Sequence, residues 1–400
     1  KRKSCRIGYA HMQILLIAPQ PFFQWRGSPI RVRYNAQALS ELGHQVTLLT
    51  LPMGEKISIS GVEIIRVPNI LGAENIPIGP SFQKAVFDLL LLWVGLQLAR
   101  KRRYDIIHAI EETGVLARVI TSLTGCRHYI YEKHSDPSSY KNGWVRNKLM
   151  ALYGKAETFA AAGSDAVICT GPGLVEQVKR SFPRKRVHHI FDIPSSLKKA
   201  DGATVDKLRS HLKKEPDEVL VTYVGSFAVY QGVDLFFNAI PLVLRQNGKA
   251  RFVIIGGSTE EIGARRLQMA AKGADQAVTF LGKISPDELP DYLSAADILA
   301  APRLAGVNTP LKVLDYFKAG RAIVATDVSA NRLILDETCA LFANPNPSEL
   351  ANAIGRLIDD GPLRQELGRC GRQRYQEKFN FGEFKSLLQS CYNQISLTVE

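Results

Sequence analysis

The sequence lacks the cysteine patterns of a disulfide scaffold or a zinc site. Six of its 400 residues are cysteine, and no two of them form a C-x-x-C pair or adjoin a histidine cluster. Scattered thiols of this kind suit a reducing cytosol, so we expect a cytoplasmic protein without a bound metal. No apolar run reaches the roughly 20 residues that a spanning helix needs, so we expect no transmembrane segment.

Two ligand-binding signatures are also missing. A dinucleotide site needs G-x-G-x-x-G after a strand, but Gly27 has no partner glycines and Gly171-Pro172-Gly173 lacks the third glycine. Nicotinamide cofactors are therefore excluded. The basic residues accompany neither an aromatic-studded sheet nor a recognition-helix motif, and we expect no nucleic-acid partner.

What the chain does have is an ordinary globular composition with an uneven charge. Hydrophobic residues make up 46% and charged residues 22%, enough for two or three packed domains. Residues 1–200 hold 28 Lys and Arg against 14 Asp and Glu, whereas residues 201–400 hold 23 against 24. We expect 1–11 to lie outside the native protein, because His11-Met12 resembles a cloning junction; without its four basic residues the first half keeps +10. That half is predicted to meet something anionic.

Apolar strands alternate with helical segments from Met12 onward, which predicts parallel sheets covered by helices. A polar, lysine-rich stretch over 194–218 divides two α/β series of similar size. We therefore predict an N-terminal Rossmann-like domain over 12–195 and a C-terminal one over 196–379, followed by a helical segment over 380–400. Ligands in such sheets bind at the carboxyl ends of the strands.

The clearest chemical motif opens a helix after a strand, at Thr309-Pro310-Leu311-Lys312. Thr309 is predicted to be the N-cap, with Pro310 in the first turn. Free N–H groups and the positive dipole end at a helix start suit a phosphate, and Lys312 there runs against the dipole preference unless an anion is bound. Asp315, about one turn on, is placed to accept from ribose hydroxyls. A capped surface helix with an incidental lysine is the plainer alternative.

This stretch, continued by Arg321-Ala322-Ile323-Val324-Ala325-Thr326-Asp327, resembles the donor-binding signature of the family-four retaining glycosyltransferases. The similarity runs in order from about Met12 to Asn380. It implies the GT-B fold, in which two Rossmann-like domains face each other across a cleft and the final helix packs back on the first domain. It also implies metal-independent hexosyl transfer from a nucleoside-diphosphate sugar, expected to be a UDP-sugar, with retention of configuration.

The resemblance carries roles to particular residues of this chain. His134, Lys312 and Arg303 would be catalytic, with the two cations and the helix start stabilising the departing diphosphate. The residues implied in donor binding are Gly27, Ser28, Gly225, Ser226, Gln231, Gly256, Gly282, Ile284, Asn308, Thr309, Pro310, Leu311 and Asp315. Three positions depart from the family pattern: Val307 replaces a glutamate, and Ser226 and Gln231 replace an arginine and a lysine. A nucleotide-sugar-binding protein with weakened catalysis therefore stays an alternative.

The acceptor side is expected on the N-terminal domain. His108, Glu111 and Glu112 end one strand and His134 ends another, where side chains face the expected cleft. A structural histidine and a solvated acidic loop are the alternatives. The acceptor is expected to be a glycan or a lipid-linked molecule at the inner membrane face, with a small soluble acceptor as the competing hypothesis.

The helix over Ala85–Arg103 is apolar nearly all round and ends in four basic residues. A helix of that kind is usually buried. Its other interpretation is peripheral contact with an anionic membrane, with Trp and Leu in the interface and the basic end on lipid headgroups. The sequence leaves both open.

Overall fold

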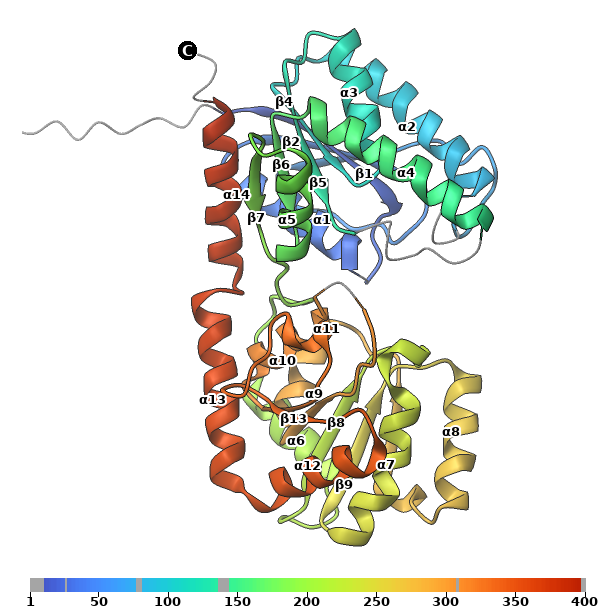
Figure 1. Ribbon diagram of the computed structural model, residues 1–400, viewed down its shortest axis with the longest axis vertical. Coiled ribbons are helices and arrows are strands. Elements are labelled where there is room, and N and C mark those ends of the chain that lie inside the picture. The colour runs from blue at the N-terminus through green and yellow to red at the C-terminus, as the bar shows by residue number, and fades with distance from the viewer. Residues whose placement is uncertain (1–10, 26, 77–80, 136–143, 307–308, 397–400) are drawn as a thin grey trace, which may run out of the picture. The chain divides into compact units, whose positions relative to one another are not determined.

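The computed structural model describes residues 11–25, 27–76, 81–135, 144–306 and 309–396. It divides the chain into two compact units, one of residues 1–191 with 384–400 and one of residues 192–383. Each unit is a Rossmann-like α/β layer structure, as the sequence predicts (Figure 1). The observed division falls a few residues from the predicted boundaries at 195 and 379.

Unit 1 is built on a seven-stranded parallel sheet of order β3-β2-β1-β4-β5-β6-β7. Its strands are β1 (Gln13–Pro21), β2 (Gln45–Leu51), β3 (Val62–Arg66), β4 (Ile106–Ile110), β5 (His128–Lys133), β6 (Ala166–Cys169) and β7 (Arg186–His189). Its helices are α1 (Gly27–Glu41), α2 (Phe82–Lys101), α3 (Thr113–Leu123), α4 (Trp144–Gly163) and α5 (Pro172–Ser181), with α14 (Phe381–Ser396) added from the end of the chain.

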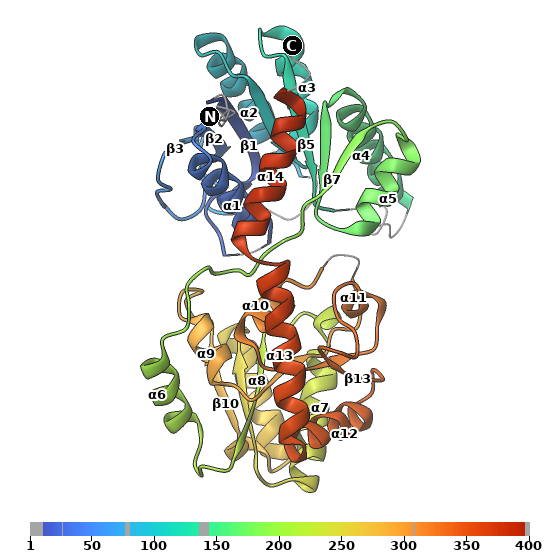
Figure 2. The ribbon, with the colours of Figure 1, turned by 90° about the vertical axis from the view of Figure 1, so that its left-hand side faces the viewer.

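The two faces of this sheet carry different helices. Residues of α2, α3, α4 and α5 share one apolar cluster with alternate residues of the strands, among them Tyr129 and Tyr131 of β5. Because successive strand residues point to opposite faces, Ile130 and Glu132 face the other side, towards α1 and α14. Figure 2 shows α14 lying along that side of the sheet beside α1.

Unit 2 has a six-stranded parallel sheet of order β10-β9-β8-β11-β12-β13. Its strands are β8 (Val219–Val224), β9 (Ala250–Ile255), β10 (Val278–Gly282), β11 (Ile298–Ala301), β12 (Ala322–Thr326) and β13 (Leu341–Ala343). Its helices are α6 (Gly202–Leu212), α7 (Val233–Gln246), α8 (Thr259–Ala271), α9 (Leu289–Ala295), α10 (Leu311–Ala319), α11 (Ser329–Arg332), α12 (Pro347–Asp359) and α13 (Gly361–Glu377), with 3-10 turns η2 (Val229–Gln231) and η3 (Asp275–Ala277).

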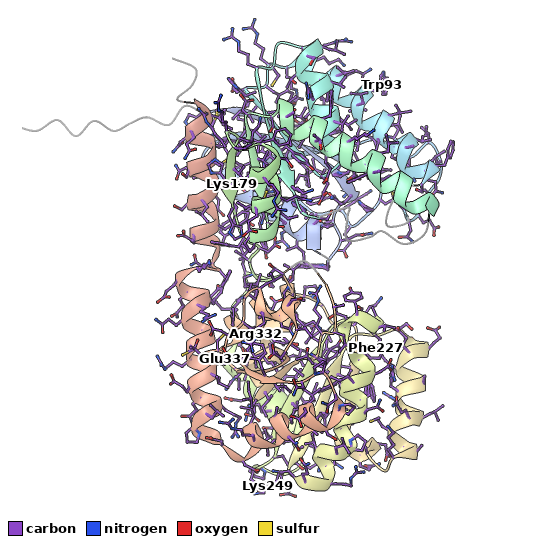
Figure 3. The ribbon with its side chains drawn as sticks, in the orientation of Figure 1. Trp93, Lys179, Phe227, Lys249, Arg332 and Glu337 are labelled. Carbon is purple, nitrogen blue, oxygen red and sulfur yellow. The ribbon has the colours of Figure 1, made fainter. Side chains whose placement is uncertain are left out.

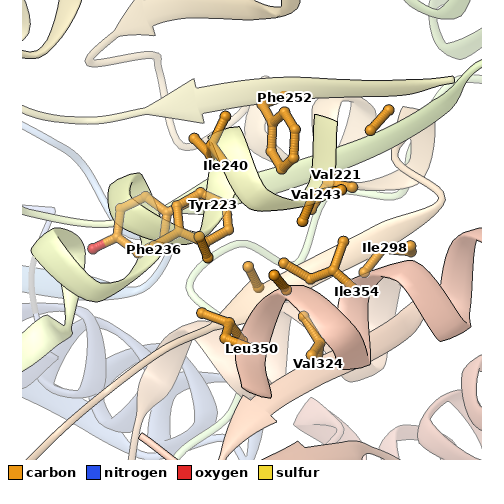
Figure 4. Packing of buried hydrophobic residues seen from close by; sticks show 14 of the residues in the cluster. Val221, Tyr223, Phe236, Ile240, Val243, Phe252, Ile298, Val324, Leu350 and Ile354 are labelled. Carbon is orange, nitrogen blue, oxygen red and sulfur yellow. The ribbon is translucent and has the colours of Figure 1, made fainter. Parts of the chain in front are cut away.

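The largest core cluster of unit 2 lies where α7 and α12 pack on the sheet (Figure 4). Tyr223 and Phe252 come from the strands, Phe236 and Ile240 from α7, and Ile354 from α12; all five are fully buried. Strands buried on both faces are nearly continuous apolar runs, which is why β8, β9, β11 and β12 are recognisable in the sequence despite single polar residues such as Arg251 of β9. This rigid layer fixes the loops that follow the strands.

Candidate functional site

The carboxyl edge of the unit 2 sheet is shaped by close approaches of backbone that only glycine permits. Gly256 has φ 118°, and a Cβ there would lie 2.0 Å from the carbonyl oxygen of Gly225. At Gly232, with φ 71°, a Cβ would lie 1.7 Å from the carbonyl oxygen of Pro302. The loops after β8, β9 and β11 therefore interlock at one edge, with backbone exposed where side chains would otherwise stand.

Lys312 carries a buried ammonium at this edge. Its Nζ has no hydrogen-bond partner within the part of the chain that the structure describes, and it lies 4.4 Å from the centre of the Tyr223 ring. A Cβ on Gly225 would lie 2.9 Å from Nζ, so glycine at this position leaves space for the ammonium. Burial, helped by the positive charge of Arg303, lowers the pKa of Lys312 to about 7. A buried cation without a counter-charge is costly, and a bound anion would relieve that cost.

The start of α10 differs from the prediction. Thr309 is not the N-cap: Pro310 holds that position, with φ −73° and ψ 100°, and no side chain caps the helix. Because the ψ of Pro310 is extended rather than helical, the helix begins at Leu311 and Thr309 lies one residue before the N-cap. Lys312 lies in the first turn as predicted. The amides of this turn are left without a side-chain cap, as at helix starts that bind anions.

Asp315, the predicted ribose acceptor, already has a protein partner. Its carboxylate accepts from the backbone N–H of Ser195 at 2.8 Å and from the Ser195 hydroxyl at 2.9–3.0 Å. Burial raises the pKa of Asp315 to about 6, although the Ser195 bonds oppose that rise. One turn further, Lys318 Nζ donates to the carbonyl oxygens of Ser196 and Lys198. This face of α10 therefore holds the segment that follows residue 194.

The remaining predicted donor residues line the same loops. Arg303 donates from Nε to the carbonyl of Ala305 at 2.7 Å, and its guanidinium lies 5.8 Å from the Tyr230 ring centre. Gln231 has a buried Oε1 without a partner among the described atoms. The carbonyl of Ser226 accepts from Tyr223 at 2.8 Å. Gly282 ends β10, and Ile284 packs against a small apolar cluster that includes Leu220 and Val253. Asn308 and Val307 lie outside the described residues.

In unit 1, the predicted site residues meet at a buried carboxylate that sequence reasoning missed. Glu132 has no exposed surface. It accepts from Arg31 Nε at 2.5 Å, Asn35 Nδ2 at 2.9 Å, His108 Nε2 at 2.7 Å and His134 Nε2 at 2.6 Å. Burial alone would raise the pKa of Glu132, but Arg31 and the two histidines outweigh it and hold the pKa well below its usual range. The carboxylate is therefore ionised and fully satisfied.

His134 is part of this network and joins it to the first turn of α1. Its Nδ1 lies 3.0 Å from the hydroxyl oxygen of Ser28, and its backbone N–H donates to Glu111 Oε1 at 2.8 Å. Burial lowers the pKa of His134, but the bond to Glu132 and the charges of Glu132 and Glu111 reverse this, so the net pKa is raised. The protonated form of the side chain is therefore more stable than in a free histidine.

The three residues predicted on the acceptor side have different surroundings. His108 departs from the prediction: it is fully buried, and its ring nitrogens are bonded to Glu132 and to the Tyr392 hydroxyl of α14, at 2.9 Å. Glu111 has φ 52°, an uncommon conformation outside glycine, and burial raises its pKa to about 7. Glu112 pairs with Lys84 of α2 at 2.8 Å.

The apolar helix α2 is not buried all round. Phe87, Leu91 and Gly95 face the core, whereas Phe82, Leu89 and Trp93 are 80%, 67% and 53% exposed. These three residues form what we call the α2 stripe. Exposed Leu123 of α3 and Leu152 and Phe159 of α4 lie on the neighbouring helices of the same layer. Figure 3 shows Trp93 on the outer side of that layer, well away from Lys179 of α5. By length and composition α2 could cross a membrane.

Within the described ranges, no group of three or more His, Cys, Asp or Glu side chains could hold a metal ion. Other contributors to the two regions escaped sequence reasoning: Tyr223 beneath the Lys312 ammonium, Ser195 on Asp315, and Arg31 on Glu132. Glu132 alone had a signal in the sequence, as a charged residue inside an apolar strand.

Comparison with known proteins matches each half of the chain to a family model. Residues 26–191 match the glycosyl transferase 4-like domain, and residues 218–360 match the glycosyl transferases group 1. An alpha-D-kanosaminyltransferase of Streptomyces kanamyceticus is 26% identical over 60% of this chain, a match that spans 64% of that protein and so under two thirds of its length. One component of the phosphatidylinositol N-acetylglucosaminyltransferase of Arabidopsis thaliana is 23% identical over 87% of this chain and 74% of its own.

Solved structures show the same fold over nearly the whole chain. A sucrose-phosphate synthase of Thermosynechococcus elongatus has a TM-score of 0.76 at 22% identity, covering 97% of this chain and 100% of its own. HepE of Anabaena, solved in complex with UDP and glucose, has a TM-score of 0.71 at 15% identity, covering 96% and 100%.

Proposed function

Because the chain belongs to the group 1 glycosyltransferases that begin with a 4-like domain, we propose that it transfers a sugar from a nucleoside-diphosphate sugar to a lipid-linked or glycan acceptor. The observation that carries this proposal is the buried ammonium of Lys312, which has no hydrogen-bond partner among the described residues and lies in the uncapped first turn of α10. A diphosphate supplies the negative charge that both features lack.

We propose a UDP-sugar as the donor. HepE of Anabaena shares the fold and was solved with UDP and glucose, which supports this choice for a chain of the same architecture. The glycines at Gly225 and Gly256 bring the loops after β8 and β9 close to the Lys312 ammonium, and Lys312 with Arg303 would face the diphosphate of the donor. The identity of the sugar is the open part of the proposal, since the family glutamate that contacts it is Val307 here.

The proposed reaction retains configuration and uses no metal ion. The bond between the anomeric carbon and the diphosphate oxygen breaks, and the acceptor oxygen bonds to that carbon on the same face. The acceptor hydroxyl passes its proton to the leaving phosphate. The negative charge that grows on the leaving group would be stabilised by Lys312, Arg303 and the free amides of α10.

We propose that the acceptor is reached at the cytoplasmic face of a membrane. The α2 stripe exposes three large apolar side chains in line along one helix. The helix ends in Arg100 and Lys101, and Arg102 and Arg103 follow directly. Such a surface suits peripheral contact, with apolar groups in the interface and cations on anionic headgroups. The Arabidopsis relative is named for action on phosphatidylinositol, which supports a lipid-linked acceptor.

The donor proposal is tested by thermal unfolding with UDP-, GDP- and ADP-glucose, because only a ligand of the folded state raises the midpoint. We expect UDP-glucose to give the largest rise, and Lys312→Met to abolish it. Lys249→Met is the matched control, since Lys249 lies on the surface of the same unit, paired with Asp217 (Figure 3). No rise with any nucleotide sugar, or an equal rise in Lys312→Met, contradicts the proposal.

The membrane proposal is tested by co-sedimentation with vesicles of pure phosphatidylcholine and with vesicles containing 30% phosphatidylserine. We expect binding to the anionic vesicles that weakens with salt and is lost in the Leu89→Ser/Trp93→Ser variant. Leu267→Ser, which alters an equally exposed leucine on α8, is the control. Equal binding of both variants, or none by the unaltered chain, contradicts a role for the α2 stripe.

A further inference from the structure

The strand β5 carries a buried charge, Glu132, on a face where an apolar side chain would be expected. Alternation along β5 puts Glu132 on the same side as Ile130, beneath α1 and α14. Leu388 and Cys391 of α14 are fully buried on that side. A carboxylate in such a place costs several kcal/mol unless it is fully bonded, and Glu132 has its four partners. A charge kept at that cost invites a functional explanation.

The network continues from Glu132 in two directions. On one side, the His108 ring is bonded to Glu132 through Nε2 and to the hydroxyl of Tyr392 on α14 through Nδ1. On the other side, the His134 ring is bonded to Glu132 through Nε2 and to the Ser28 hydroxyl, in the first turn of α1, through Nδ1. One end of the chain of hydrogen bonds is therefore anchored in the C-terminal helix. The other ends at a partly exposed serine of the expected substrate site.

The proton positions follow from the chemistry of the partners. An ionised carboxylate only accepts, so Nε2 of His134 must carry a proton. If His134 is also protonated at Nδ1, it donates to Ser28, and the Ser28 hydrogen is then free to point elsewhere. If Nδ1 is bare, the Ser28 hydroxyl must turn inward and donate to it. The charge state of His134 thus decides which way Ser28 donates.

We infer that Glu132 is a positioning residue, which holds His134 as a double donor and so turns the Ser28 hydroxyl outward to donate to an oxygen of the bound substrate. This inference rests on the proposed function, because it assigns the substrate to the loop at Ser28. Among the described residues, the charged groups that act on His134 are Glu132 from β5, Arg31 from α1 and Glu111 from the end of β4. The two carboxylates favour the imidazolium and Arg31 opposes it, and Glu132 alone of the three bonds to the ring.

The first arm of the test reads His134 directly in the substrate-free protein. Nitrogen-15 NMR of the imidazole from pH 5 to 9 distinguishes the doubly protonated ring from each neutral tautomer. We expect the unaltered chain to keep both ring protons at pH 7, and Glu132→Gln to lose the Nδ1 proton at a lower pH. A neutral ring at pH 6 in the unaltered chain overturns the inference, whatever the protein's substrate is.

The second arm measures UDP-glucose binding and hydrolysis in a double-mutant cycle. We expect Glu132→Gln and Ser28→Ala each to weaken kcat/KM about tenfold, as for one lost hydrogen bond, and the double variant to be no worse than either single one. Ser28→Thr, which keeps the hydroxyl, should restore activity. Losses that multiply in the double variant overturn the inference, because Glu132 would then act independently of Ser28.

Two further variants separate this effect from simple loss of stability. Tyr129→Phe removes a buried hydrogen bond to Ala160 on the opposite face of β5, and is expected to lower the melting temperature without altering the pH profile of hydrolysis.

If Glu132→Gln does not fold, the test compares the activity of Ser28→Ala with that of Ser28→Thr over pH 6–9. We expect the advantage of threonine to shrink at the pH where His134 loses its Nδ1 proton, and a constant advantage contradicts the inference. Failure of the unaltered chain to bind any nucleotide sugar would count against the proposed function. The NMR experiment would still test the protonation of His134, because it uses the substrate-free protein.

Discussion

Each unit buries a charge near the carboxyl edge of its sheet, and the two charges are handled in opposite ways. Glu132 in unit 1 is fully enclosed and accepts hydrogen bonds from four side chains. Lys312 in unit 2 has an equally enclosed Nζ, but no partner for it among the residues that the structure describes. A satisfied buried charge organises the protein around it, whereas an unsatisfied one indicates where a ligand of opposite charge binds.

The pKa directions express the same contrast. Burial opposes the charged form in both cases, yet the partners of Glu132 reverse that effect and hold its pKa well below the usual range. Nothing reverses it at Lys312, whose pKa falls to about 7. Asp315 lies between these extremes, since its bonds to Ser195 only partly offset burial and its pKa is raised to about 6.

The largest effect is expected from removing the satisfied charge. Glu132→Ala removes a fully buried carboxylate that is paired with Arg31, and breaking a buried ion pair typically costs about 3–5 kcal/mol. Urea unfolding at pH 7 checks this, with Glu132→Gln as the milder companion. A loss below about 1 kcal/mol would show that the network contributes little to the fold.

Removing the unsatisfied charge should leave the fold intact and lower activity. Lys312→Met keeps the length of the side chain, and we expect a loss of about 100- to 1000-fold in kcat for transfer or donor hydrolysis. Steady-state kinetics with circular dichroism of the same samples checks this. Unchanged turnover in a folded variant would remove Lys312 from the site.

The same variant should gain stability in a pH-dependent way. The folded-state pKa of Lys312, about 7, lies below its ordinary value of 10.5. Below pH 7 the buried charge therefore lowers the free energy of unfolding, and the folded chain releases that proton as the pH rises. The unfolded chain keeps the proton until about pH 10. We therefore expect Lys312→Met to be more stable than the unaltered chain. The difference in unfolding free energy should be largest below pH 7 and should shrink as the pH rises from about 7 to about 10. The free energy of unfolding measured from pH 6 to 10 checks this, and an advantage independent of pH contradicts the assigned pKa.

A smaller effect is expected at the intermediate case. Ser195→Ala removes the hydroxyl bond to Asp315 and should cost about 1 kcal/mol of unfolding free energy. Because the Ser195 bonds favour the ionised carboxylate, the Asp315 pKa should rise further above 6, and the cost of the substitution should grow as the pH rises through that range. Thermal unfolding between pH 4 and 8 checks this, and a flat difference would exclude Asp315 as the titrating group.

The fold was predictable because its determinants are local. Apolar strands, intervening helices and glycine turns are visible in the sequence. The order of the donor-domain motifs was enough to identify the resemblance to the glycosyltransferase family. Lys312 could be singled out because a cation in the first turn of a helix needs an anion. What the sequence could not show is which groups become partners. Ser195 is 120 residues from Asp315, and Tyr392 is 284 residues from His108.

Two errors have plain physical causes. Thr309 has the chemistry of an N-cap, but Pro310 has an extended ψ of 100° in place of a helical one, so the helix begins one residue later. The sequence predicts that His108 ends a strand and faces the substrate, yet it is the middle residue of β4 and points to the face covered by α14. No local pattern reveals that a helix from the far end of the chain lies there. The α2 helix illustrates the same limit, because the exposure of Leu89 and Trp93 depends on what packs against them.

The most direct test of the contrast is the proton balance of donor binding. Isothermal titration of UDP-glucose at pH 8, in buffers of different ionisation enthalpy, measures the protons taken up on binding. At pH 8 the Lys312 ammonium of the unbound protein is mostly deprotonated, and a bound diphosphate should restore its proton. We predict an uptake approaching one proton, absent in Lys312→Met. Tight binding with no uptake, or the same uptake in the variant, would contradict the assignment of the buried ammonium to the donor diphosphate.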